Sequence, residues 1–433
     1  MTDARSQNPA VSATLAFLGS PRFSAALTLA IIGSQLAALL LQKLTGWPGD
    51  LGVVTGLTIF AALSLIAQHE AIEWHGLLPV SLLIFAGWTT LSILWSQYNW
   101  ATAGSVVYFL SVTFLGIYVA LVRDTIQIAR AFGDVLRVVL AVSVALEIFS
   151  GVLIDVPIPL LGIQGNLAEF GPIQGIFGAR NLLGIVALVA LVTFGTELRT
   201  QSVPRDRAIG SIVLAGAVLL FTRSPIAFGT FLVVALAAVA LFALRRATPD
   251  RKRVWQLVLL IVTLTIGVMT WIGRNQIISA LSASSELNKR LSIWQPLRLL
   301  IPQHNLEGYG WAGHWWEDLV PFLFIRDSSG NIPSSALNAY LDVWFQLGII
   351  GLFAFVVLIS LAFIRSWLLA SRQRSVVYAW PALVLVVLLV SGLAESSLLV
   401  EFGWLTFVVC TVKASRELSW RKAFAETDRR SLE

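Results

Sequence analysis

The sequence predicts an all-α, polytopic membrane protein with about twelve transmembrane helices. Of its 433 residues, 57% are hydrophobic and only 12% are charged, whereas a soluble domain carries roughly 25% charged residues. The apolar residues gather in runs close to the length of about 20 that a helix needs to cross a bilayer. An open strand edge would leave unpaired backbone groups in lipid, and the runs lack the alternation of a membrane barrel, so helices are the expected element.

The twelve expected spans leave one long segment between the ninth and the tenth. Residues 1–273 hold spans one to nine, residues 274–339 form a large extracytoplasmic loop, residues 340–413 hold spans ten to twelve, and residues 414–433 form a cytoplasmic tail. The expected spans are 22–43, 51–68, 76–95, 101–122, 132–153, 181–197, 207–222, 225–244, 254–273, 340–364, 378–394 and 397–413.

The placement of basic residues predicts the orientation. With both termini in the cytoplasm, 22 of the 30 Lys and Arg residues fall in cytoplasmic segments, as the positive-inside rule requires. The densest group lies at residues 245–253. The net charge of +6 is then explained by basic segments that face the anionic inner leaflet of the membrane, and it indicates no nucleic-acid partner. We expect a multi-pass protein of the cytoplasmic membrane whose partners include the lipid bilayer.

The long loop has the pattern of amphipathic helices at the outer membrane face. Its stretch NKRLSIWQPLRLLI places Leu291, Trp294, Leu297 and Leu300 at helical spacing. The stretch GWAGHWWEDLVPFLFI that follows is aromatic and apolar, so we expect short helices in this loop as well.

Ionisable residues are costly in a membrane bundle and mark candidate functional positions. The outer ends of the expected spans carry Glu147, Arg180, Arg223, Arg290, Asp342 and Glu395. Three arginines around one outer pocket would bind a phosphate or diphosphate through planar, bidentate guanidinium groups. The alternative for each arginine is a side chain that reaches the membrane interface. We expect no metal and no cofactor, because Cys410 is the only cysteine and the four histidines lack zinc spacing.

Arg223 precedes a helix start that could bind an anion. In FTRSPIAF, Ser224 has the character of an N-cap and Pro225 that of a first helical residue. The free N–H groups of such a helix end favour an anion, which Arg223 would help to hold. A tight turn between two spans explains the same residues.

Four segments resemble the bacterial O-antigen ligase/polymerase superfamily of membrane proteins that assemble polysaccharides. They are IFGARNLLGIVALVAL at 176–191, LLFTRSPIAF at 219–228, RLSIWQPLRLLIPQHNLEGYGW at 290–311, and SALNAYLDVWFQLGIIGL at 335–352. The third contains an Arg-x-x-x-Trp and a Gly-x-Gly pattern, and the fourth ends in Gly-(apolar)₂-Gly-Leu. The segment ESSLLVEFGWLTFVV at 395–409 fits the closing helices of the family.

The resemblance implies a metal-independent, inverting transfer of glycan from a polyprenyl-diphosphate carrier to a lipid or glycan acceptor. It makes Arg290 the best candidate for the diphosphate, followed by Arg223 and Arg180. The family pattern has a histidine before Asn338 as the general base, but this chain has Leu337, which cannot accept a proton. The second departure is that Arg223 precedes Ser224, whereas the family arginine follows the serine.

Three explanations of Leu337 remain open at this stage. Another residue could be the base, with His314, Asp342 and Glu395 as candidates. The chain could be a binding, transport or scaffold protein for lipid-linked glycans, or it could be an inactivated variant. The expected spans carry almost no charge at their centres, which favours an outward-facing transfer site over a transport route.

Overall fold

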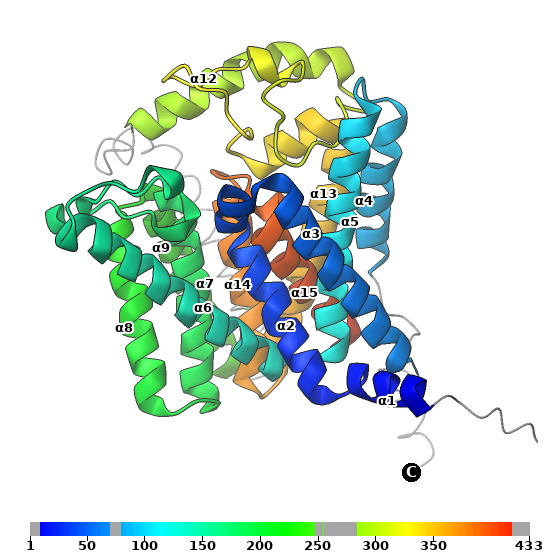
Figure 1. Ribbon diagram of the computed structural model, residues 1–433, viewed down its shortest axis with the longest axis vertical. Helices are drawn as coiled ribbons and strands as arrows, with labels where there is room; N and C mark the ends of the chain where they lie inside the picture. The colour runs from blue at the N-terminus through cyan, green and yellow to red at the C-terminus, as the bar shows by residue number, and fades with distance from the viewer. Residues whose placement is uncertain (1–8, 70–78, 247–253, 255–283, 418–433) are drawn as a thin grey trace, which may run out of the picture.

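The computed structural model is an α-helical bundle covered at one end by a separate layer of chain (Figure 1). It describes residues 9–69, 79–246, 254 and 284–417. In the described part, regular structure is helical except for one isolated bridge between Ile158 and Ile163. The helices are α1 (Pro9–Leu18), α2 (Pro21–Leu36), α3 (Ala38–Ala67), α4 (Val80–Leu91), α5 (Asn99–Val122), α6 (Thr125–Ile148), α7 (Arg180–Thr200), α8 (Arg205–Thr222), α9 (Pro225–Arg246), α12 (Ser284–Leu300), α13 (Ala339–Arg372), α14 (Ala379–Ser391) and α15 (Glu401–Glu417).

The predicted class, a polytopic helical membrane protein, is confirmed. Six helices in the described residues are long and apolar enough to cross a membrane, namely α3, α5, α6 with its extension to Leu153, α7, α9 and α13. The other expected spans in this part coincide with the shorter helices α2, α4, α8, α14 and α15. The expected span 254–273 and most of the basic group 245–253 lie outside the described residues, so the count of twelve stays a prediction.

The N-terminal region differs from the sequence prediction in two ways. Residues 9–18 form helix α1, which the apolar runs did not indicate. The expected span 22–43 is divided, because α2 ends at Leu36 and α3 begins at Ala38 and bends at Gly46, where φ is +73°. The residues after this bend run along the bundle, and Trp47 lies at the end that carries α12, since its ring is 6.0 Å from that of His314.

Helix α13 is broken at Gly348, where φ is +68°. Residues 305–310 pair with the broken backbone: the amide of Gly310 donates to the carbonyl of Gln346 at 2.9 Å, and the amide of Ile349 donates to that of Asn305 at 2.8 Å. A Cβ on Gly348 would lie 2.1 Å from the carbonyl oxygen of Leu306. The glycines of the two sequence motifs therefore allow two backbones to approach each other closely.

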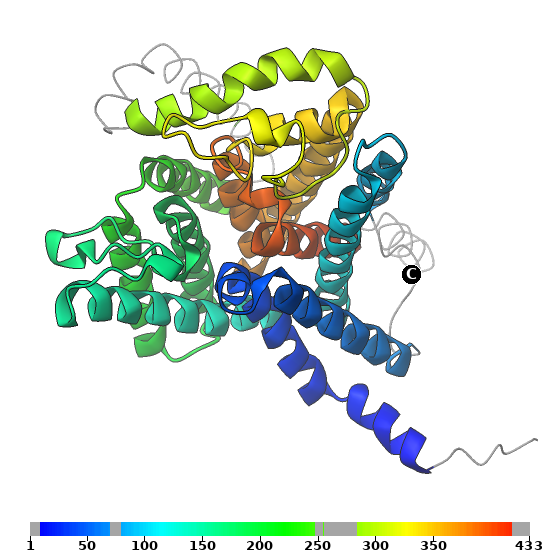
Figure 2. The same ribbon diagram turned by 45° about the horizontal axis from the view of Figure 1, so that its top comes forward.

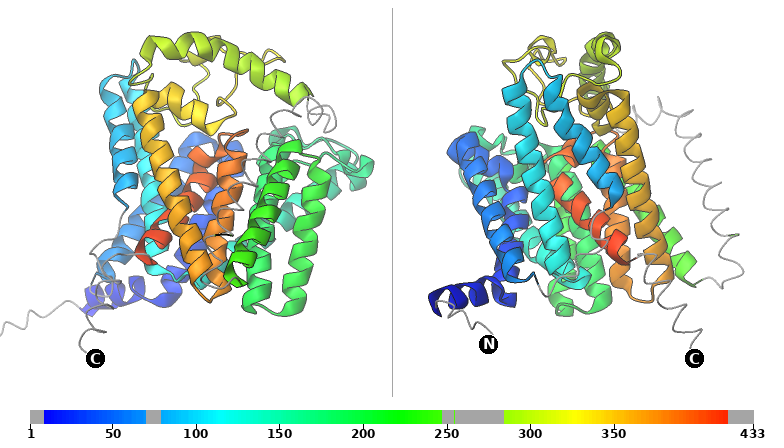
Figure 3. Two further views of the ribbon diagram at one scale, coloured as in Figure 1. Left: turned by 180° about the vertical axis from the view of Figure 1, so that it is seen from behind. Right: turned by 90° about the vertical axis from the view of Figure 1, so that its right-hand side faces the viewer.

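The break divides α13 into a part that is long enough to cross a membrane and a part that lies at the covered end. The 24 residues 349–372 are about 36 Å long at 1.5 Å per residue, enough to cross the hydrocarbon core of about 30 Å. Residues 339–347 are therefore not needed in the span. They run beneath α12 at the covered end of the bundle (Figure 3).

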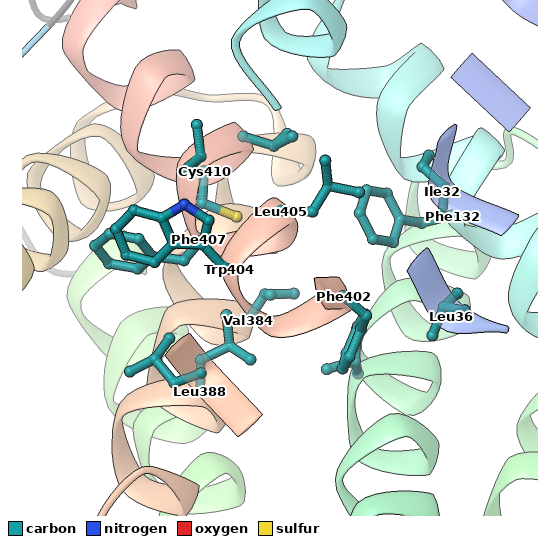
Figure 4. Packing of buried hydrophobic residues seen from close by; sticks show 14 of the residues in the cluster. Ile32, Leu36, Phe132, Val384, Leu388, Phe402, Trp404, Leu405, Phe407 and Cys410 are labelled. Atoms are coloured by element: carbon teal, nitrogen blue, oxygen red, sulfur yellow. The ribbon is translucent and has the colours of Figure 1, made fainter. Parts of the chain in front are cut away.

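The main core joins helices from both ends of the chain. Trp404, Leu405 and Phe407 of α15 are almost fully buried, and α15 packs against α2, α5, α13 and α14 (Figure 4). Helices α6–α9 gather on one side of this centre, where α7 packs against α14 and α6 (Figure 2). Neighbouring ends of α7, α9, α14 and α15 thus reach the covered end together.

The layer over this end, residues 284–338, is called the cap below. Its helix α12 lies across the bundle, and a second apolar cluster, with Ile293, Leu297 and Trp315 among its buried residues, joins α12 to the start of α13. The helical prediction for the first part of the loop is correct. Leu291 is 37% exposed and lies off the buried face. The aromatic stretch 310–325 is mostly irregular chain with one short 3₁₀ turn at Phe322–Phe324.

Candidate functional site

Among the described residues, Arg290 of α12 is the most buried arginine at the covered end, with 8% of its side chain exposed. Its Nε and Nη2 atoms donate to the carbonyl oxygen of Ala394 at 3.2 and 3.0 Å. Nη2 also lies 3.2 Å from Oε1 of Glu395. The segment that joins α14 to α15 and the cap are thus held together by one guanidinium.

Arg180 and Arg290 converge on a single carboxylate, that of Glu286. Oε1 of Glu286 accepts from Nη2 of Arg180 at 2.8 Å, and Oε2 accepts from Nη1 of Arg290 at 3.3 Å. Burial alone would raise the pKa of Glu286, but the hydrogen bonds and charges of Arg180 and Arg290 outweigh it and hold this pKa below its usual value. Two guanidiniums from distant parts of the chain therefore surround one anionic position.

The network continues from Glu395 into the bundle. Asn181 donates its Nδ2–H to Oε1 of Glu395 at 2.8 Å, and its Oδ1 accepts from the hydroxyl of Ser224 at 2.7 Å. Burial raises the pKa of Glu395, against the charge of Arg290 and the hydrogen bond from Asn181. Asn181, at the centre of its sequence motif, thus links the starts of α7 and α9 to the segment 392–400.

Ser224 caps α9, as the sequence predicts. Its Oγ accepts from the amide of Ala227 at 3.1 Å, and Pro225 is the first helical residue. Arg223 has φ of +46°, and its exposed guanidinium donates to the carbonyl oxygen of Glu169 at 3.4 Å. Its described contacts therefore lie outside the network that joins Arg180 and Arg290.

Glu147 stabilises the local fold through hydrogen bonds to backbone amides. It is 1% exposed, and its Oε1 accepts from the amides of Gln174 and Gly175 at 2.7 and 2.8 Å. These bonds tie residues 171–178 to α6.

Leu337, at the position of the family histidine, is half-buried against the cap cluster and has φ of +50°. The next residue, Asn338, caps α13 by accepting from the amides of Tyr340 and Leu341 at 3.0 Å each. Its Nδ2 donates to the carbonyl of Leu393 at 2.9 Å, and its amide donates to the hydroxyl of Ser396 at 3.2 Å. Leu337 therefore lies beside the same 392–400 segment that Arg290 binds.

A groove of about 570 Å³ lies between α12 and the first part of α13. Its lining combines two indoles with polar side chains: Trp294, Arg298, Ile301, Pro302, Asn305, Asn338, Leu341 and Trp344. The indole of Trp344 donates to Oδ1 of Asn305 at 3.1 Å. Asn338 places one end of the groove beside Leu337.

His314 pairs with a residue that the sequence prediction did not single out, Glu401. Nε2 of His314 lies 2.7 Å from Oε1 of Glu401, while the imidazole remains 35% exposed. Burial lowers the pKa of His314, but Glu401, with smaller contributions from Asp342 and Asp50, raises it above its usual value overall. A histidine tied to a carboxylate by one nitrogen is a common arrangement for a general base.

Further polar groups lie beneath this pair. Asp50 is fully buried, and its Oδ2 accepts from Gln42 at 3.0 Å and from the hydroxyl of Tyr108 at 3.2 Å. Oδ1 of Asp50 is buried and has no hydrogen-bond partner in the part of the chain that the structure describes. The ring of Trp47 lies 6.2 Å from that of Tyr108 and 6.0 Å from that of His314, so the groups form one cluster.

Asp342 of α13 lies between the network of Arg290 and Glu395 and the cluster around His314, and it is fully buried. Its Oδ1 accepts from Trp315 and Gln346 at 2.8 Å each, and its Oδ2 accepts from the amide of Ala336 at 3.2 Å. With both oxygens engaged, this carboxylate is suited to holding the cap on α13.

Sequence reasoning missed Glu286, Glu401, Asp50 and Tyr108. Asp50 and Glu401 are single acids at the edges of apolar runs, a signal that marks functional candidates in membrane proteins. Glu286 stands in a polar stretch and gives no such signal.

Comparison with known proteins identifies one family. The family model described as O-antigen ligase matches residues 210–356, which include most of α8, all of α9, the cap and the break in α13. The match confirms the resemblance to the O-antigen ligase/polymerase superfamily and supports a role in glycan transfer. It is shorter than the likeness in the sequence motifs, since Arg180, Glu395 and Glu401 lie outside it. No curated protein matches the chain.

Proposed function

We propose that the protein transfers a glycan from a polyprenyl-diphosphate donor to a lipid or glycan acceptor, at the capped end of the bundle and on the outer side of the cytoplasmic membrane. The observation that carries this proposal is the convergence of Arg180 and Arg290 on Glu286. A carboxylate and a phosphate offer similar oxygens to guanidinium groups. The position that Glu286 occupies is therefore suited to one phosphate of the donor.

Catalysis at such a site requires the leaving diphosphate to be stabilised as the bond to the sugar breaks. Guanidinium groups held in place before the reaction serve this purpose without reorganisation. Arg290 is fixed by Ala394 and Glu395, and Arg180 has its Nη2 bound only to Glu286 among the described residues. Phosphate binding would replace Glu286 and leave the support of Arg290 by Ala394 unchanged.

The groove between α12 and α13 is suited to the sugar residues. The apolar face of a sugar ring packs against an indole, and its hydroxyls bind amides and guanidinium groups. Trp294 and Trp344 supply the first kind of contact, and Arg298 and Asn305 the second. A volume of about 570 Å³ lies within the usual range for a small-ligand site.

A non-enzymatic protein that binds or moves lipid-linked glycans is the second candidate. Leu337 supports it, because the residue at the family histidine position has no proton acceptor. The arginine site would then bind the donor without turnover. The two candidates share donor binding and differ in transfer.

The test is a direct binding assay with undecaprenyl diphosphate and the purified protein. Arg180→Ala and Arg290→Lys should each lower the affinity about ten- to a hundredfold, as expected for the loss of a charge-assisted bidentate contact. Arg290→Lys keeps the buried positive charge opposite Glu395, so the fold should be retained.

Lys289→Ala provides the matched control. Lys289 precedes Arg290 on α12 but pairs with Asp327 at 3.5 Å and is 46% exposed. Its loss should leave donor affinity within about twofold. Equal losses for Lys289→Ala and Arg180→Ala would mean that general positive charge, and not this site, attracts the lipid.

A further inference from the structure

We infer that His314, oriented by Glu401, accepts the proton of the acceptor hydroxyl in the proposed transfer. This inference rests on the proposed function and supplies the base that Leu337 cannot. Its first support is the direction of the hydrogen bond. A carboxylate can only accept, so Nε2 of His314 carries the proton in the 2.7 Å contact with Glu401.

The second ring nitrogen, Nδ1, is then free to accept a proton. With Nε2–H bound to Glu401, Nδ1 carries a lone pair, and within the described residues it has no hydrogen-bond partner. The side chain is 35% exposed, so a substrate hydroxyl can reach it. One fixed nitrogen and one open nitrogen are the features that orient an imidazole for general base catalysis.

The surroundings favour the protonated product of this step. Charged groups that act on His314 from the packed elements are Asp50 on α3, Asp342 on α13 and Glu401 on α15. Tyr108 on α5 donates its hydroxyl to Asp50. The acids stabilise an imidazolium, and the unpartnered Oδ1 of Asp50 can reorganise toward a new donor. Gln35 on α2, 2% exposed, has no well-formed hydrogen bond and lies next to Tyr108. Unsatisfied buried polar atoms of this kind indicate room for a polar ligand or water.

The base and the arginine site are joined by a short segment of chain and by contacts through the start of α13. Glu395 and Glu401 are six residues apart, so their Cα atoms are separated by no more than about 22 Å. Between the two groups, Trp315, the neighbour of His314, binds Asp342, and Asn338 lies one turn before Asp342 and binds Leu393. A sugar between the diphosphate and the acceptor fills part of this space.

The step balances as a direct displacement. The acceptor oxygen attacks the anomeric carbon and forms the new glycosidic bond, while its proton passes to Nδ1 of His314. The bond from the anomeric carbon to the diphosphate oxygen breaks, and the polyprenyl diphosphate leaves with the electron pair. The imidazolium then returns its proton to water.

The experiment measures transfer of a labelled donor to acceptor, together with donor binding, in the full-length protein. His314→Gln should lower the rate constant for transfer about 10²- to 10⁴-fold, the usual range for a general base, and leave donor affinity unchanged. Glu401→Gln should lower the rate less and move the acidic limb of the pH–rate profile to lower pH, because the carboxylate that raises the pKa of His314 is removed.

A second His–Glu pair in the cap gives the matched control. His304 lies 3.0 Å from Glu307 and both are more than a third exposed, so His304→Gln should leave transfer unchanged. Normal transfer by His314→Gln, or an unchanged pH profile in Glu401→Gln, would overturn the inference. Loss of donor binding in Arg180→Ala and Arg290→Lys is measured separately, so failure of the base assignment leaves the proposed donor site standing.

Discussion

Arg290 and Glu395 form an ion pair of 3.2 Å between the cap and the segment that joins α14 to α15. The pair is nearly buried, and such pairs owe their effect to position more than to net stability. Its importance lies in the segments of the chain that it joins. Arg290 also binds Glu286 and Glu395 also binds Asn181, so four segments of the chain meet at one anionic site.

Glu286→Gln should strengthen donor binding. In the free protein the carboxylate competes for the two guanidiniums that the donor needs, and a neutral amide competes less. We expect an affinity increase of about tenfold, equivalent to about 1.4 kcal/mol, in the undecaprenyl diphosphate assay. Glu317→Gln, an exposed acid elsewhere in the cap, is the control. A weaker affinity in Glu286→Gln would mean that Glu286 helps to hold the ligand.

The same carboxylate predicts a pH dependence of stability. The pKa of Glu286 is lowered in the folded protein, so its ion pairs stabilise the fold above its usual pKa of about 4.5. This stabilisation is lost as the pH falls through the lower, folded-state pKa. The melting temperature of the wild type should therefore exceed that of Glu286→Gln at pH 7, and the difference should shrink below about pH 4.5. A difference that is independent of pH would show that the charge of Glu286 contributes nothing.

Gly348→Ala should destabilise the protein and loosen the cap. A residue with a Cβ is strained at φ of +68°, and that atom would lie 2.1 Å from the carbonyl oxygen of Leu306. Strain of this kind costs on the order of 1–3 kcal/mol, and the clash adds to it. Gly195→Ala in α7 is the control, because its Cβ would meet no atom within 4 Å. Thermal unfolding in detergent should separate the two variants, and equal melting temperatures would contradict the role of the break.

The orientation can be tested with two matched cysteines. Ser328 in the cap and Ser375 after α13 are both exposed, whereas the native Cys410 is buried. An impermeant thiol reagent added to intact cells should label Ser328→Cys and not Ser375→Cys. Permeabilised cells, in which both should react, give the control. The reverse pattern would place the cap in the cytoplasm and exclude an outward-facing site.

Sequence reasoning recovered the helices better than it recovered the contacts between them. Each expected span in the described part coincides with helix, although span 22–43 is divided between α2 and α3, because each helix buries or exposes to lipid a nearly continuous apolar surface. The apolar runs could not locate the bends at Gly46 and Gly348. The second bend depends on the approach of residues 305–310, which are distant in the sequence. A glycine permits such a bend, but the sequence does not show which backbone lies opposite it.

The candidate site was predicted only in part, because its contacts also depend on segments that are distant in the sequence. Arg180, Arg290 and Glu395 were singled out as isolated charges, and they do converge. The role of Glu286 depends on a fold that brings residue 180 next to residue 286, and no local pattern encodes such a contact. His314 was one of three candidate bases, but only its contact with Glu401 distinguishes it from Asp342, whose oxygens are engaged.

The last prediction concerns Leu337, where the family pattern has a histidine. If His314 is the base, Leu337→His should change the rate of transfer by less than about threefold. If the chain instead lacks any base, the same substitution should raise the rate by about one to several orders of magnitude, the range for general base catalysis.

The substitution itself should be tolerated, so the result can be interpreted. Leu337 is only half-buried, and its φ of +50° lies in the left-handed region, where histidine is found more often than leucine. Asn338 keeps its hydrogen bonds to Leu393 and Ser396, because they involve its own atoms. Leu337→Gln is the control, since its side chain has a similar size and polarity but cannot accept a proton at neutral pH. A rise in Leu337→His alone would assign the missing base to position 337 and exclude His314. Transfer that stays undetectable in both variants and in the wild type, with donor still bound, would favour a binding protein over an enzyme.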